Sequence, residues 1–129
     1  LECIDKNLKK KIHIGNTYNN LLETSSSFVL PLKKTSYCKN IYWVYPLLLN
    51  DSDVNKQDLI DYLHSRGVGT RPFFYPLNLQ PVVKKYGIEQ DGLEISKDLY
   101  DRGFYIPSGL SLTNQEQEYV ASSLLDYFS

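Results

Sequence analysis

The sequence predicts an α/β fold in which helices pack on a small, largely antiparallel or mixed sheet. Apolar residues recur at helical spacing near both ends of the chain, and stretches rich in aromatic and β-branched residues alternate with helical patterns between them. Glycine or proline marks most of the boundaries. With 129 residues and 42% hydrophobic content, the chain is expected to form one domain with one modest core.

The first predicted helix occupies about the first 22 residues. Its apolar stripe, with lysines between its members, consists of Leu1, Ile4, Leu8 and Ile12. The lysine run 9–11 is interpreted as a solvated helix face. Because the chain starts inside this pattern and contains no methionine, we expect a piece of a longer polypeptide, against which the stripe packs.

Residues 28–32 and 40–49 are predicted strands, because both are rich in aromatic and β-branched side chains. Pro31 and Pro46 place each of them towards a sheet edge or a strand end. Residues 68–74 are predicted as a further strand, and residues 104–109 as a short extended piece.

Residues 55–66 predict a helix that Asn55 caps and that Gly67 ends in a left-handed conformation. Its inward positions are expected to be Leu59, Ile60 and Leu63.

Two short helices should follow, one from Pro81 to a stop at Gly87 and one ending at Gly103. Thr113 and Glu116 form a capping box at the start of the last helix. The buried stripe of that helix is expected to be Val120, Leu124 and Phe128.

The balance of charge excludes several partners. The 14 Lys and Arg residues are nearly balanced by 15 Asp and Glu residues, so the net charge does not produce the strong electrostatic field of a nucleic-acid or membrane-surface binder. No apolar stretch reaches the roughly 20 residues that a bilayer core requires, and a cytoplasmic protein is expected. Cys3 and Cys38 lie far apart and are interpreted as reduced packing residues.

No motif in the sequence points to a self-contained catalytic or metal site. His13 and His64 lack partners at ligand spacing and are interpreted as surface residues. Asp51, Asp53 and Asp58 fit a loop and a helix start better than a calcium loop. No metal is expected.

The stretch GTRPFFYPLNLQPVVKKYG, residues 69–87, combines an arginine, three consecutive aromatics and three prolines. The planar fork of Arg71 suits phosphate or carboxylate, and Phe73, Phe74 and Tyr75 follow it between two prolines that limit backbone freedom. One interpretation is a loop that contacts a sugar or nucleotide. The other is plain strand packing, with Arg71, Phe73 and Tyr75 on one side and Phe74 in the core.

Two segments resemble a known family. SRGVGTRPFFYPLNLQPVVKKYG and ISKDLYDRGFYIPSGLSLTNQEQEYV are similar to the C-terminal part of the DegT/DnrJ/EryC1/StrS family of pyridoxal phosphate-dependent sugar aminotransferases. TRPFFYPL and IPSGLSLT most resemble its perosamine synthase-like members. These enzymes aminate the 4-keto group of a nucleotide-linked 4-keto-6-deoxy sugar, with glutamate as amino donor.

The resemblance implies the small C-terminal domain of a fold-type I aminotransferase, with residues 1–27 as a connecting helix and residues 28–129 as the small domain. The lysine that binds pyridoxal phosphate as a Schiff base would lie in a large domain outside the chain. No lysine here has the serine-rich context of that lysine, and all are expected to be solvated. The chain alone should hold no cofactor and no catalytic residue, and the intact enzyme should be a homodimer.

The resemblance also implies candidate substrate contacts at Arg71, Phe73, Phe74, Tyr75 and Asn78. Many relatives have histidine at the last of these positions. Asparagine can still hydrogen-bond a hydroxyl or phosphate, but it does not titrate near neutrality. An alternative function is a non-catalytic, free-standing domain that serves as a protein-interaction or nucleotide-sugar-binding module.

Overall fold

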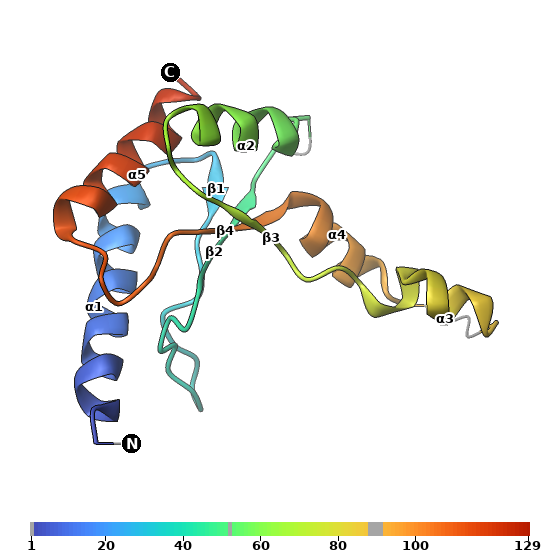
Figure 1. Cartoon of the computed structure of the whole chain (residues 1–129), viewed down its shortest axis with the longest axis horizontal. Coiled ribbons are helices and arrows are strands. Elements are labelled where there is room, and N and C mark those ends of the chain that lie inside the picture. Colours follow the sequence, from blue (N-terminus) through green and yellow to red (C-terminus); the bar gives the residue numbers. More distant parts are fainter. Residues whose placement is uncertain (1, 52, 88–91) are drawn as a thin grey trace.

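The computed structural model describes residues 2–51, 53–87 and 92–129. Along the chain the elements are α1 (Ile4–Leu22), β1 (Phe28–Val29), β2 (Tyr45–Leu49), α2 (Lys56–Ser65), β3 (Arg71–Pro72), the 3-10 helix η1 (Leu77–Leu79), α3 (Pro81–Lys85), α4 (Glu94–Arg102), β4 (Gly103–Ile106) and α5 (Asn114–Asp126). Figure 1 shows α1 beside α5, with α2 near their upper end and the sheet next to them. Helices α3 and α4 form an arm that extends away from this body (Figure 1).

The four strands form one sheet in the order β1-β2-β4-β3, and every pair is antiparallel. The predicted α/β class with a largely antiparallel sheet is therefore confirmed. The strands are shorter than predicted: residues 30–32, 40–44, 68–70 and 73–74 lie outside the ladder. Pro46 is the second residue of β2 and so lies near a strand end, one of the two predicted positions, although β2 is an inner strand. Because β1 pairs only with Leu48 and Leu49, Pro46 is unpaired on that side.

One face of the sheet carries the core. Helices α1, α2 and α5 bury apolar side chains against it, and the cluster from helices and sheet contains Ile14, Tyr18, Leu22, Phe28, Tyr45, Leu47, Leu49, Leu59, Leu63, Phe104, Ile106, Val120 and Leu124. The inward residues predicted for α2 are all buried. Of the stripe predicted for the last helix, Val120 and Leu124 are buried and Phe128 packs half-buried just beyond the end of α5.

The first helix buries a different set of residues from the predicted stripe. Leu1 lies outside the described residues, Ile4 is exposed, and Leu8 and Ile12 are only half-buried. The fully buried positions are in the second half of α1, where the helix packs on α5 and the sheet (Figure 1). The division at residue 27 stays a prediction.

The predicted helix ends are largely confirmed. The side chain of Asn55 accepts a hydrogen bond from the amide of Gln57, and Thr113 and Glu116 form the capping box at α5. Gly67 and Gly87 have φ of 76° and 64°, the left-handed conformation that glycine adopts most readily. None of the described helices is long and apolar enough to cross a membrane.

Candidate functional site

The second face of the sheet is more open than the core face. Residues of β2 alternate between buried and half-buried, so Pro46 and Leu48 point to the side opposite the core. Pro46 lies opposite Tyr105, and Tyr105 lies opposite Arg71 on the next strand. Directly opposed residues project to the same face, so these three form a row across the sheet. We call this side the open face.

Phe73 extends this row because its ring stacks on that of Tyr105. The ring centroids are 4.8 Å apart and the planes differ by 11°. The stack depends on Gly103, since a Cβ at that position would lie 2.5 Å from Cδ2 of Phe73 and 2.3 Å from the carbonyl oxygen of Leu99. Gly103 ends α4 as predicted, but with φ of −93°, so the site requires glycine for space and not for a left-handed backbone.

Phe74 does not enter the core, and the interpretation that placed it there is wrong. Its side chain is 70% exposed, and its ring meets the edge of the Tyr105 ring at a centroid distance of 6.0 Å. The reason is that β3 ends at Pro72, so the alternation of a strand does not continue into the aromatic run. Arg71, Phe73 and Phe74 therefore gather around Tyr105.

Tyr75 and Asn78 belong to the neighbouring part of the loop. The ring of Tyr75 packs edge-on against Tyr100 of α4 at 5.0 Å, and its hydroxyl donates to the carbonyl of Leu79 at 3.4 Å. Pro76 is buried, and Asn78 is half-buried in η1. The predicted contact residues thus form two groups, one on Tyr105 and one on Tyr100.

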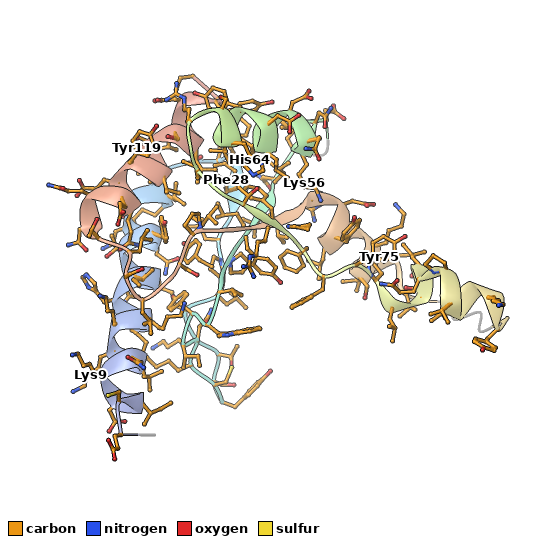
Figure 2. All side chains as sticks on the ribbon, viewed as in Figure 1. Lys9, Phe28, Lys56, His64, Tyr75 and Tyr119 are labelled. Carbon is orange, nitrogen blue, oxygen red and sulfur yellow. The ribbon has the colours of Figure 1, made fainter. Side chains whose placement is uncertain are left out.

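Lys56 connects the two groups from the start of α2. Its Nζ donates to the carbonyls of Tyr100 and Gly103, and it lies 4.8 Å from the centre of the Tyr100 ring. Figure 2 shows Lys56 near the end of α4 that adjoins the sheet and Tyr75 further out along the arm. Burial lowers the pKa of Lys56, partly offset by Asp101. The expectation that every lysine is solvated is therefore wrong for Lys56. It is also wrong for Lys11, because its Nζ donates to the carbonyl of Ser108 and burial lowers its pKa.

Chemically, the open face is suited to binding. The exposed guanidinium of Arg71 can pair with phosphate or carboxylate, and the rings of Phe73, Phe74 and Tyr105 offer flat apolar surface to a sugar or a base. Burial raises the pKa of the Tyr105 hydroxyl, which keeps it a neutral donor. Sequence reasoning missed Tyr105, Tyr100 and Lys56. The signals that could have suggested them are the position of Tyr100 in the last turn of α4, that of Tyr105 just after Gly103, and that of Lys56 at the start of α2.

The exposure predicted for the two histidines is confirmed, whereas the interpretation of the two cysteines is not. His13 and His64 are exposed, as predicted, and hydrogen-bond to Asn114 and Thr70. Cys3 and Cys38 are free but exposed, so their interpretation as packing residues is wrong. Within residues 2–51, 53–87 and 92–129, no group of three His, Cys, Asp or Glu side chains could hold a metal ion.

The fold is shared with solved sugar aminotransferases. PseC of Helicobacter pylori, an aminotransferase involved in pseudaminic acid biosynthesis, superposes with a TM-score of 0.82 at 19% identity, covering 94% of this chain and 32% of that one. Spr1654 of Streptococcus pneumoniae in its PLP form gives a TM-score of 0.87 at 16% identity, covering 96% of this chain and 32% of that one. These matches confirm the predicted fold, that of the small domain of fold-type I aminotransferases.

The sequence comparisons define the family. A model of the DegT/DnrJ/EryC1/StrS aminotransferase family matches residues 1–125. GDP-perosamine synthase of Escherichia coli O157:H7 is 27% identical over 129 residues, which cover 100% of this chain and 34% of that protein. The chain belongs to the DegT/DnrJ/EryC1/StrS aminotransferase family, and it spans about a third of the length of the curated relatives that it matches.

Proposed function

We propose that this chain is the small domain of a nucleotide-sugar aminotransferase, which transfers an amino group from glutamate to a 4-keto-6-deoxy sugar nucleotide. The observation that carries the proposal is the cluster on the open face, where Arg71 lies opposite Tyr105 and Phe73 stacks on the same ring. Membership of the family supports the reaction type, and the similarity to GDP-perosamine synthases supports the substrate class.

In this proposal the open face forms one wall of the substrate site. Arg71 binds a phosphate of the nucleotide through its fork of donors, and the aromatic surface around Tyr105 packs against a sugar or base ring. Tyr75 and Asn78 form the continuation of the wall towards the arm. These residues bind and orient the substrate, and none of them is assigned a role in bond making.

Pyridoxal phosphate would supply the electron sink for amino transfer in the intact enzyme. The lysines described here do not fit its covalent attachment. Lys11 and Lys56 are the half-buried ones with described contacts, and each already donates to backbone carbonyls. We therefore propose that the cofactor is held by a part of the enzyme beyond these 129 residues, in a homodimer that is expected from the family resemblance.

The test is a product assay with the intact enzyme, pyridoxal phosphate, glutamate and a nucleotide-linked 4-keto-6-deoxy sugar. Mass spectrometry should detect the amino sugar nucleotide and an equal amount of 2-oxoglutarate. Binding of the nucleotide sugar without either product would favour the non-catalytic binding module instead. The same assay with the 129-residue chain alone should yield neither product.

A further inference from the structure

A separate hollow of about 580 Å³ lies between α1 and the hairpin of residues 33–40. Its lining includes Lys33, Lys34 and Lys39, and none of the described residues that line it is acidic. Within the described part of the chain, none of the three lysines is in an ion pair. A concave surface of this size suits a small ligand, and its charge favours an anion.

Two of these lysines face each other across the hairpin. Lys34 and Lys39 form an isolated antiparallel bridge, so their side chains leave the ladder on the same side. Like charges placed directly opposite each other destabilise a strand pair. The hairpin therefore retains a repulsion that a bound anion would relieve.

The hairpin is held in shape by its own hydrogen bonds. Oγ1 of Thr35 accepts from the amides of Tyr37 and Cys38, and the amide of Thr35 donates to the carbonyl of Cys38 at 2.9 Å. The amide of Asn40 donates to the carbonyl of Lys33 at 3.1 Å. A ligand that binds here meets a preformed loop and has less ordering entropy to overcome.

The floor of the hollow is strained. Tyr42 lines it with φ of 52°, a left-handed conformation that is costly for an aromatic residue. Its ring lies against Gly15, where a Cβ would come within 2.1 Å of it, and its hydroxyl accepts a hydrogen bond from Nδ2 of the buried Asn19 at 2.8 Å. Strain of this kind concentrates at ligand-binding sites.

From the opposed lysines, the absence of acidic groups in the described lining and the strained floor, we propose that this hollow binds a phosphate-type oxyanion. The ligand is a nucleoside diphosphate group or an inorganic phosphate compound. The ammonium groups of Lys34 and Lys39, which leave the hairpin on the same side, can donate to several oxygens of such an anion at once. The proposal does not depend on transamination, so its failure would leave the proposed function untouched.

Calorimetric titration of the chain with inorganic pyrophosphate at low ionic strength tests the proposal. We expect saturable binding that Lys39→Gln weakens about tenfold, because one charge-assisted bond is lost. Without ligand, the same variant should have a higher Tm than the parent, since the repulsion from Lys34 is removed. The control is Lys9→Gln, whose residue lies on the side of α1 turned away from the hairpin (Figure 2).

Absence of saturable binding would overturn the proposal, and so would an equal loss of affinity in Lys9→Gln and Lys39→Gln. A second titration, with a nucleoside diphosphate, separates the two sources of the anion. Tighter binding than pyrophosphate, lost in Tyr37→Ala, identifies a nucleotide whose base stacks on this 88% exposed ring. Equal affinities identify the inorganic anion, and both results support the site.

Discussion

The ring of Phe73 lies almost parallel to that of Tyr105, at a centroid distance of 4.8 Å, on the side of the sheet that faces away from the core. Arg71 is paired with the same Tyr105 on the neighbouring strand. This one tyrosine therefore determines where the arginine and the aromatic surface lie relative to each other.

Arg71→Ala in the intact enzyme is expected to lower kcat/KM for the nucleotide sugar about 10- to 150-fold, the effect of losing a charge-assisted bond of roughly 1.5 to 3 kcal/mol. The glutamate half-reaction should be unchanged, because it does not involve the sugar nucleotide. Stopped-flow measurement of the two half-reactions checks this. Arg66→Ala is the control, since Arg66 pairs with Asp126 away from the open face. Equal losses in both half-reactions of Arg71→Ala would refute a contact between Arg71 and the nucleotide sugar.

Phe73→Ala should reduce the free energy of unfolding by about 1 to 3 kcal/mol, because it removes a half-buried ring from the stack on Tyr105. Phe74→Ala should cost less than about 1 kcal/mol, because that ring is mostly exposed. Urea unfolding of both variants provides the comparison. A larger loss in Phe74→Ala than in Phe73→Ala would contradict the packing seen around Tyr105.

Gly103→Ala is expected to destabilise the fold by about 1 to 3 kcal/mol, because the added Cβ meets the Leu99 carbonyl and the Phe73 ring. Gly69→Ala is the matched control, since a Cβ there has no atom within 4 Å. The measurement is the Tm of each variant in thermal unfolding, which should fall in Gly103→Ala and stay near the parental value in Gly69→Ala. If both variants unfold at the parental Tm, the close approach of Phe73 to the glycine is incorrect.

Lys56→Met should lower stability by about 1.5 to 3 kcal/mol, because the Nζ hydrogen bonds to the carbonyls of Tyr100 and Gly103 are lost. Hydrogen exchange should also become faster in residues 73–79, since Tyr100 supports Tyr75. Lys97→Met serves as the control, because the ion pair that Lys97 forms with Asp101 is exposed on both sides. Unchanged exchange in Lys56→Met would show that α4 is held in place without this lysine.

The chain should lose stability as the pH rises above about 10, the ordinary pKa of tyrosine. Burial raises the pKa of Tyr18 and of Tyr45, so their folded-state protons are held more tightly than in the unfolded chain. The stabilisation that these two tyrosines add to the free energy of unfolding is fully present below pH 10 and is lost as the pH rises above it. In urea unfolding between pH 8 and 11, the free energy of unfolding of Tyr45→Phe should fall less steeply with pH than that of the parent. The control is Tyr37→Phe, at an exposed position, which should follow the parent.

Much of the fold could be predicted because its signals are local. The cap at Asn55, the capping box at Thr113 and the left-handed glycines each depend on a few neighbouring residues. The extent of the strands was less predictable. Residues 40–44 have β-forming composition, yet they lie outside the ladder, because the pairing of β2 with β4 ends at Tyr45 and Ile106 and the next residue, Pro107, has no N–H to continue it.

The sequence by itself determined the fold class, the order of the elements and the segment that carries the candidate site, since periodicity, caps and prolines act within a few residues. Only the tertiary structure decided which side chains of that segment share a surface. Phe73 and Phe74 are adjacent in sequence. The end of β3 at Pro72 and the space left by Gly103 let the first stack on the Tyr105 ring, whereas the second meets that ring edge-on and stays mostly exposed. The buried half of α1 and the role of Lys56 were decided in the same way, because each depends on partners more than 40 residues away in the chain.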